Sequence, residues 1–257
     1  MANRDIEDRP LALVTGAGRR VGIAAACVER LARDGFDVAW TDWSSYDARV
    51  HGRADEEAES ELMSTVDAAG GVGQRVEIDL ASADAAPRLF DAVEAVHGRA
   101  PSCLVMCHTE SVNSGLLDTT AAALDAHYAV NVRATWALLR EFGLRFDGNT
   151  GRGRVIAMTS DHTVGNLPYG ATKGALDRIV LAAAHELAHL RVTSNVINPG
   201  ATDTGWMNDE VIAAVTAATP LGRLGQPEDA ANLVSFLCSQ EGGWMNGQLL
   251  MSNGGAA

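Results

Sequence analysis

The chain has 257 residues, a length that fits one α/β domain of ordinary size. Its net charge of −13 argues against a nucleic-acid-binding surface and against binding to an anionic membrane, because both partners repel an acidic protein. Hydrophobic residues make up 47% of the chain and aromatic residues only 5%, which indicates a large aliphatic core and favours small-molecule chemistry.

The amino-terminal residues 1–10 are polar and lack the apolar core of a signal peptide. No segment approaches the ~18 consecutive apolar residues that a membrane span needs. We therefore expect a polar tail at 1–10, one domain at 11–257, and a cytoplasmic protein with no membrane partner and no nucleic-acid partner.

Short apolar runs alternate with helical periods along the chain. The predicted strands are 11–15, 38–42, 75–79, 103–107, 155–159, 193–198 and 248–251. The predicted helices are 22–34, 54–69, 84–97, 120–146, 169–190, 209–218 and 227–239. This alternation implies parallel strands joined by right-handed crossovers, so the predicted fold class is α/β, with a doubly wound, Rossmann-like sheet and helices on both faces. Ligands then bind at the carboxyl ends of the strands.

The segment after the first predicted strand is a glycine-rich turn that opens a helix. Small residues there let the backbone approach a pyrophosphate, whose charge is met by backbone amides and the positive end of the helix. In one register Gly16 and Gly22 are the first and last motif glycines, with Arg20 in place of the middle one. In the register we prefer, the loop is two residues longer, Gly22 is the middle glycine and Ala24 packs closely. Both registers predict a dinucleotide site that includes Gly16, Gly22 and Ile23.

The ends of the next two predicted strands indicate which dinucleotide binds. Asp42 ends the second strand, where such folds place an acidic residue on the adenosine ribose. A carboxylate there repels a 2′-phosphate, so NAD(H) is preferred. Arg19 and Arg20 lie near the same ribose and offer charge to a 2′-phosphate, which leaves NADP(H) open. Asp79 and Leu80 end the third strand and are placed to flank the adenine ring, with a helix cap as the alternative for Asp79.

Four cysteines lie in apolar contexts without paired spacing: Cys27, Cys103, Cys107 and Cys238. They suit buried free thiols in a reducing compartment. Cys103, Cys107 and His108 raise the alternative of metal ligands. Because both cysteines fall on one face of a predicted strand, we favour buried thiols and expect no metal.

Tyr169 and Lys173 are four residues apart in a predicted helix, which places a phenol and an ammonium on one face, one turn apart. A nearby cation lowers a tyrosine pKa from its ordinary value of about 10. A hydroxyl from Ser160, after the preceding strand, would complete a site that polarises a carbonyl and moves a proton to or from its oxygen. The alternative is a chance helical pair with a solvated lysine.

In this order and spacing, these features make the chain similar to the short-chain dehydrogenase/reductase family over residues 11–255. The matching motifs are Thr15-Gly16 with Gly22, Asp79-Leu80, Asn131-Val132, Thr159-Ser160, Tyr169-x-x-x-Lys173, Asn198-Pro199-Gly200 with Thr204, Arg223-x-Gly225-x-Pro227-Glu228-Asp229 and Asn253-Gly254-Gly255. The resemblance implies an NAD(P)-dependent oxidoreductase acting on a carbonyl/secondary-alcohol pair, such as a 3-oxoacyl thioester or a related ketone.

The resemblance also implies a catalytic tetrad of Asn131, Ser160, Tyr169 and Lys173. Tyr169 would be the acid in carbonyl reduction and the base in alcohol oxidation, and Ser160 would hydrogen-bond the substrate oxygen. Lys173 would hold the nicotinamide ribose and lower the tyrosine pKa. Asn131 would hold a water that joins Lys173 to solvent.

Further cofactor contacts follow from the same resemblance. Pro199, Gly200, Thr202 and Thr204 would border the nicotinamide, at the start of a segment, 200–226, that we expect to form a substrate lid. The family usually has Asn-Asn-Ala-Gly after the fourth strand, where this chain has Met106-Cys107-His108-Thr109. We keep Cys107 as a cofactor contact and expect His108 to pack over the cofactor.

Two other classes of protein share this scaffold. A non-catalytic NAD(P)-binding sensor or scaffold is the main alternative, against which the intact tetrad argues. A non-redox lyase or dehalogenase is a third, but such relatives tend to lose the dinucleotide turn or the lysine, and this chain has both. The resemblance further implies a homotetramer or homodimer built through the predicted helices at 120–146 and 169–190.

Overall fold

The structure, a computed structural model, describes residues 9–149 and 151–256. Seven strands form one sheet in the order β3-β2-β1-β4-β5-β6-β7. Their bounds are β1 Leu11–Thr15, β2 Asp37–Asp42, β3 Gly73–Glu77, β4 Cys103–Met106, β5 Arg154–Met158, β6 Thr193–Asn198 and β7 Leu249–Met251. Every pairing is parallel, which confirms the predicted doubly wound α/β fold. Of the predicted polar tail, residues 1–8 lie outside the described residues.

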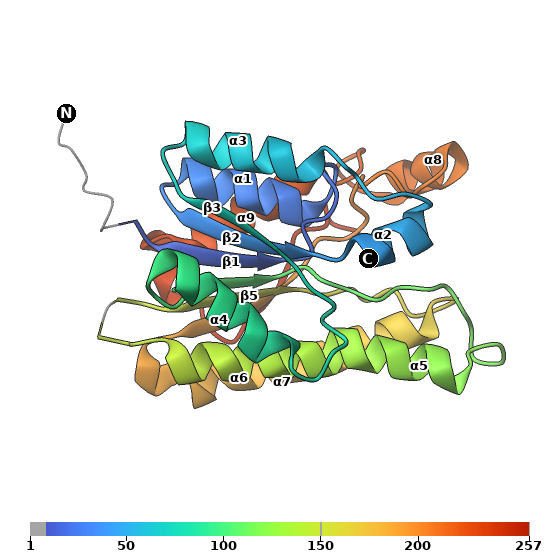
Figure 1. Cartoon of the computed structure of the whole chain (residues 1–257). Helices are drawn as coiled ribbons and strands as arrows, with labels where there is room; N and C mark the ends of the chain where they lie inside the picture. Colours follow the sequence, from blue (N-terminus) through green and yellow to red (C-terminus); the bar gives the residue numbers. More distant parts are fainter. Residues whose placement is uncertain (1–8, 150, 257) are drawn as a thin grey trace.

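Helices cover both faces of the sheet. They are α1 Ile23–Arg33, α2 Ser44–His51, α3 Ala58–Ala68, α4 Ala85–His97, α5 Ala121–His127, α6 Thr135–Arg145, α7 Leu167–Glu186, α8 Asp209–Ala218 and α9 Pro227–Cys238. Helices α1, α3 and α9 lie on one face and α4, α6 and α7 on the other (Figure 1). Because the central strands β1, β4 and β5 are buried on both faces, they are mostly apolar without alternation, and every residue of β1 is buried. In residues 9–149 and 151–256, no helix has the length and apolar character to cross a membrane.

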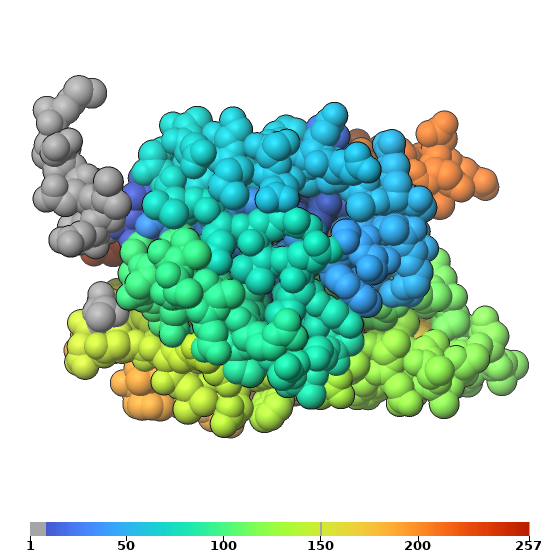
Figure 2. Space-filling model, viewed as in Figure 1, coloured from blue at the N-terminus to red at the C-terminus, as the bar shows by residue number. Residues whose placement is uncertain are grey.

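The strand register gathers the candidate site at one edge of the sheet. Thr15 pairs with Met106, and Met106 with Ala157, so the segments that follow β1, β4 and β5 emerge together. Helix α2 lies at this carboxyl-end edge, at the same end of the molecule as the projecting α8 (Figures 1 and 2). The fold therefore places the glycine-rich turn, Cys107 and Ser160 in one region.

The structure differs from the predicted elements at several places, and α7, for example, ends at Glu186 rather than at residue 190. Helix α2 was not predicted, because its sequence has no apolar period; its end is marked by Gly52, which has the left-handed φ of 80° common after helices. Strand β3 begins and ends two residues earlier than predicted. Helix α3 begins at Ala58 rather than at residue 54. The predicted helix at 120–146 is two helices joined by a π-helical turn, Tyr128–Ala134, of the kind that often marks functional sites.

Candidate active site

Three elements bring the predicted tetrad together. Ser160 follows β5, Tyr169 and Lys173 lie in the first half of α7, and Asn131 lies in the π-helical turn. The Ser160 hydroxyl lies near the Tyr169 phenol and stabilises its charged form. The Lys173 Nζ atom lies 5.6 Å from the centre of the Tyr169 ring. A phenol, a hydroxyl and an ammonium therefore form one contiguous group.

Burial controls the acidity of Tyr169. It raises the pKa of the phenol, the Ser160 hydroxyl lowers it, and the nearby Asp161 raises it, with a net upward direction. The sequence predicted a lowered pKa for Tyr169, and that prediction is wrong for the protein without a bound dinucleotide. Desolvation disfavours the phenolate, and here its effect is larger than the stabilisation of the phenolate by Ser160.

Lys173 is fully enclosed, with 2% of its surface exposed. Its Nζ atom donates a hydrogen bond to the Met158 carbonyl at 2.9 Å. Burial lowers the pKa of Lys173 to about 8, against smaller upward effects of Cys107 and Asp177. An ammonium with a pKa this close to neutrality exchanges its proton readily, which suits a group that resupplies a proton donor.

The Asn131 amide ties the loop after β4 to α7. Its Oδ1 atom accepts from the Glu110 amide at 2.7 Å and from Thr109 Oγ1 at 3.2 Å. Its Nδ2 atom donates to the Glu110 carbonyl and to Thr172 Oγ1, each at 2.9 Å. These contacts use the full hydrogen-bonding capacity of the amide. The water predicted at Asn131 stays a prediction, and the side chain has no position left for it.

His108 is a buried side chain that links β1 to the start of α6, and its packing over a cofactor stays a prediction. Thr15 Oγ1 accepts from the Cys107 and His108 amides at 3.2 and 3.4 Å, so its own hydrogen points to His108 Nδ1 at 2.7 Å. The other ring nitrogen, Nε2, therefore carries the proton, and it lies 3.5 Å from Thr135 Oγ1. Burial lowers the pKa of His108 to about 3, with a smaller contribution from Lys173, so the ring is neutral near pH 7.

This neutral histidine predicts a specific acid sensitivity. As the pH falls from about 6.5 toward 3, the unfolded chain takes up a proton at residue 108 that the folded protein refuses, so the free energy of unfolding decreases. We expect this slope, about 1 kcal/mol per pH unit, to be absent in His108→Asn, whose amide oxygen replaces Nδ1 as the acceptor. Urea unfolding between pH 4 and 7 measures it, and the exposed His185→Asn serves as control. Equal slopes in wild type and His108→Asn would contradict the assignment.

The glycine-rich turn fits a pyrophosphate. Gly16 has a φ of 84°, and a Cβ there would lie 2.8 Å from the His108 amide nitrogen, so glycine is required. Gly22 is the N-cap of α1, with no side-chain cap and no acidic residue in the first turn. The amides that open α1 thus keep their donors free for an anion. Ala24 is buried as the preferred register expects, although both registers remain compatible with this turn.

The charged residues near the turn are paired differently from the prediction. Asp42, expected on the ribose, receives two hydrogen bonds of 2.7 Å from the Arg75 guanidinium. Arg20, expected near the same ribose, forms ion pairs with Asp55, Glu57 and Glu61. Arg19 contacts His51 Nε2 at 3.2 Å and donates to the Thr204 carbonyl. Of the two turn arginines, Arg19 is therefore the one without a carboxylate partner among the described residues.

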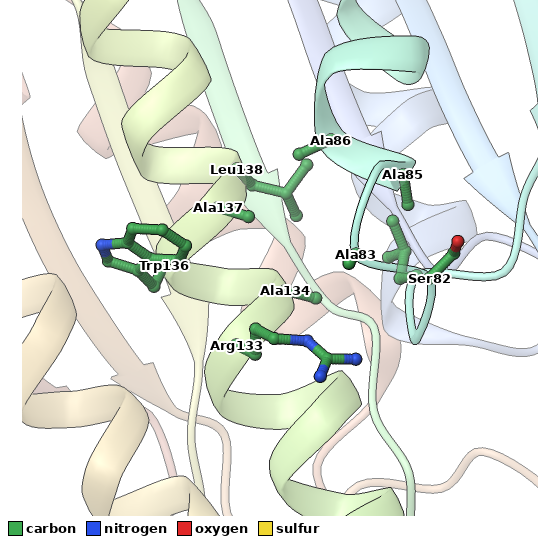
Figure 3. Close-up of a pocket in the computed structure, with 10 residues that line it drawn as sticks. Ser82, Ala83, Ala85, Ala86, Arg133, Ala134, Trp136, Ala137 and Leu138 are labelled. Carbon is green, nitrogen blue, oxygen red and sulfur yellow. The ribbon is translucent and has the colours of Figure 1, made fainter.

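Asp79 and Leu80 face different hollows. Asp79 lines an open hollow of about 410 Å³ together with Trp43, Glu77, Ile78, Ser82 and Arg88. Its Oδ1 atom also accepts from the Ala81 amide at 2.8 Å, as in a capping turn. The Leu80 side chain is buried and lines a second hollow, about 110 Å³, together with several alanines and with Arg133 and Trp136 (Figure 3). A contact between Leu80 and an adenine ring therefore requires its backbone.

The segment that begins at Pro199 lies against both the turn and the carboxyl terminus. Gly200 has a φ of 63°, and a Cβ there would approach Asn253 Cβ to 2.5 Å. Thr202 pairs with Gly225 across the base of the expected lid. Through the Thr204 carbonyl, Arg19 joins this segment to the dinucleotide turn. The predicted lid is thus linked directly to the candidate cofactor site.

The cysteines are free thiols but pair in space. Cys107 hydrogen-bonds Cys27, and Cys103 Sγ lies 3.1 Å from Cys238 Sγ. Sequence spacing missed these pairs because they join β4 and the residue after it to the distant helices α9 and α1. In the described part of the chain, no group of three or more His, Cys, Asp or Glu is arranged to hold a metal.

Sequence reasoning also missed two acidic residues near the site. Glu110 is buried and forms an ion pair of 2.6 Å with Arg49 of α2. Asp47, also on α2, is buried beside Gly18. A carboxylate shortly after a strand end was the available signal for each, but only the docking of α2 brings them to the site.

Known proteins resemble the chain along nearly its whole length. A family model described as enoyl-(acyl carrier protein) reductase matches residues 16–257. The uncharacterized oxidoreductase YjdA of Bacillus subtilis is 37% identical over 250 residues, which cover 95% of this chain and 96% of YjdA. The (3R)-3-hydroxyacyl-CoA dehydrogenase of Mus musculus is 31% identical over 255 residues, 95% of each chain.

A solved structure supports the same assignment. A blue fluorescent protein from a metagenomic library, in complex with NADPH, superposes with a TM-score of 0.84 at 27% identity, covering 96% of this chain and 98% of that chain. The chain therefore belongs to the short-chain dehydrogenase/reductase family. It is an NAD(P)-dependent oxidoreductase of that family, as the sequence motifs predicted.

Proposed function

We propose that the protein interconverts a carbonyl and a secondary alcohol on a small molecule, with Asn131, Ser160, Tyr169 and Lys173 as its tetrad. The observation that carries this proposal is the contact of the Tyr169 phenol with Ser160, above a buried lysine whose pKa is lowered to about 8. A sensor has no use for such a group. A proton-transfer site requires it.

In this mechanism the bound dinucleotide supplies or accepts the hydride. In the reducing direction, Tyr169 donates its phenolic proton to the substrate oxygen, which Ser160 orients by a hydrogen bond. The raised pKa of Tyr169 keeps the phenol protonated and ready to donate. Lys173 then returns a proton toward the tyrosine. Asn131 holds the loop after β4 against Thr172, and so fixes the position of α7.

The cofactor proposed is NAD(H) in preference to NADP(H). The amides near Gly16, Gly22 and Ile23 would receive its pyrophosphate. Pro199, Gly200, Thr202, Thr204 and Cys107 would border its nicotinamide half. Segment 200–226 would act as the lid, and the contact between Arg19 and Thr204 supports this role because cofactor binding and lid position then share one side chain.

For the substrate, we propose a 3-oxoacyl thioester or a related ketone with an apolar tail. The name of the mouse relative, a (3R)-3-hydroxyacyl-CoA dehydrogenase, supports this class. The loop after β4 contacts the short segment between Ser160 and Tyr169, because the Leu167 amide donates a hydrogen bond to the Ser114 carbonyl at 2.9 Å. Apolar side chains near this junction are open to solvent, with Leu117 98% and Val164 92% exposed, and would cover an acyl chain.

A substrate panel tests the proposed function. We expect NADH or NADPH to bind in calorimetry and 3-oxoacyl thioesters of increasing chain length to be reduced, with kcat/KM rising by several-fold per added pair of methylenes. Small polar ketones serve as the matched control. Tight dinucleotide binding without turnover of any carbonyl would support the sensor alternative instead.

We further propose a homodimer or homotetramer built through α6 and α7. On α6, Trp136 and Leu144 are 53% and 66% exposed, which is unusual for large apolar side chains and suits burial against a second copy. Light scattering measures the assembly, and a monomer at all concentrations would contradict it.

A further inference from the structure

Helix α2 brings a second carboxylate to the glycine-rich turn. A Cβ placed on Gly18 would overlap Asp47 Oδ2 and would lie 3.2 Å from Asp42 Cβ, so both acidic side chains converge on Gly18. Asp47 is 7% exposed. The side chains of Asp47 and Asp42 therefore border the place where the sequence predicts the adenosine ribose, and Asp47 does so with its carboxylate.

The two carboxylates differ in what they contact. Both oxygens of Asp42 accept from Arg75, which balances the charge of Asp42. No described residue donates a hydrogen bond to the Asp47 carboxylate or forms an ion pair with it. A largely enclosed carboxylate without a protein donor is available to a ligand that offers hydrogen-bond donors.

The charged groups around Asp47 come from three segments. Arg19 of the turn attracts its charge, while Asp42 of β2 and Asp55 before α3 repel it. Burial is the largest effect, and the pKa of Asp47 is raised to about 6. Near pH 8 the side chain is thus an ionised, largely enclosed acceptor to which no described residue donates.

We infer that Asp47, rather than Asp42, accepts the hydrogen bonds of the adenosine ribose hydroxyls and excludes a 2′-phosphate. This inference rests on the proposed binding of NAD(P). Two vicinal hydroxyls offer the donors that the Asp47 carboxylate lacks, whereas a 2′-phosphate offers only negative charge. Helix α2 is then the element that selects the cofactor, and Arg75 keeps Asp42 in a structural role.

Calorimetry with NADH and NADPH at pH 8 tests the inference on three variants: Asp47→Asn, Asp42→Asn and Asp55→Asn. We expect Asp47→Asn to shift the ratio of the two affinities toward NADPH by about 10-fold or more, because a buried like charge is removed from the 2′ position. Asp42→Asn is expected to shift the ratio less than about 3-fold and to lower thermal stability, since Arg75 loses its most buried carboxylate partner and keeps only Glu59 and Glu77. Asp55→Asn is the matched acidic control, expected to shift the ratio much less than Asp47→Asn, because the charge of Asp55 is balanced by Arg20.

A second measurement uses the wild-type protein alone. Hydroxyl donors stabilise the Asp47 carboxylate, so NADH binding near pH 6 should release protons, detected as a dependence of the binding heat on the ionisation enthalpy of the buffer. Asp47→Asn should abolish this release. The inference would be overturned if Asp42→Asn, rather than Asp47→Asn, changed the ratio of the two affinities, or if NADH binding released no protons. Either result would leave the proposed function intact. If neither dinucleotide binds the wild type, the proposed function fails and the inference with it.

Discussion

Tyr169→Phe is expected to lower kcat by at least about 10³-fold and to leave dinucleotide affinity within about 2-fold of wild type. General acid–base groups contribute about 10²- to 10⁴-fold, and Tyr169 is proposed as the group that delivers the proton to the substrate oxygen. Phenylalanine keeps the ring that lies 5.6 Å from Lys173 Nζ, so the packing of α7 is preserved. Steady-state kinetics with the best carbonyl substrate, together with calorimetric NADH binding, measures the two effects separately.

Two control variants distinguish the loss of proton transfer from a general effect of removing a hydroxyl group. Tyr128→Phe removes the same hydroxyl from a tyrosine that is 44% exposed and outside the tetrad, and it should retain full activity. Ser160→Ala should reduce kcat less than Tyr169→Phe, because Ser160 orients the oxygen without transferring the proton. Activity near the wild-type level in Tyr169→Phe would refute the proposed mechanism.

Features encoded within a short stretch of sequence could be predicted. The alternation of strands and helices was enough to predict the parallel sheet. Strand β6 and helix α8 have the predicted bounds because the sequence carries local signals at both ends of each element. The contact between Tyr169 and Lys173 was predictable because four residues make one helical turn. Ser160 could be predicted at the ligand edge because it comes two residues after the end of a parallel strand.

Features that depend on distant partners could not be predicted. The charge balance of Asp42 is set by Arg75 on the neighbouring strand, and that pairing follows from the register of β2 and β3. Helix α2 has no apolar stripe, and it is joined to the rest of the protein by Arg49 through its ion pair with Glu110. The direction of the Tyr169 pKa depends on how deeply the phenol is buried, which no local motif specifies.

Lys173→Met is expected to lower kcat by about 10²-fold or more and yet to make the folded protein more stable at pH 7. The pKa of Lys173 falls from 10.5 to about 8 because the ammonium is buried, and this difference of about 2.5 pKa units corresponds to at most about 3 kcal/mol. Below pH 8 both folded and unfolded wild-type chains carry the proton, and the folded state bears the cost of the buried charge. Methionine fills a similar volume without that cost, although the hydrogen bond to the Met158 carbonyl is lost.

The pH dependence gives the sign test for this prediction. Between pH 8 and 10.5 the folded wild type releases the Lys173 proton before the unfolded chain does, so its free energy of unfolding should rise with pH relative to Lys173→Met. Lys173 is the sole lysine of the chain, so NMR on protein with isotope-labelled lysine reports its titration without overlap. Asp177→Asn should lower the titration midpoint further, because Asp177 stabilises the ammonium. A midpoint near the ordinary lysine value of about 10.4 would show that the ammonium is solvated, and would remove the proton-resupply role proposed for it.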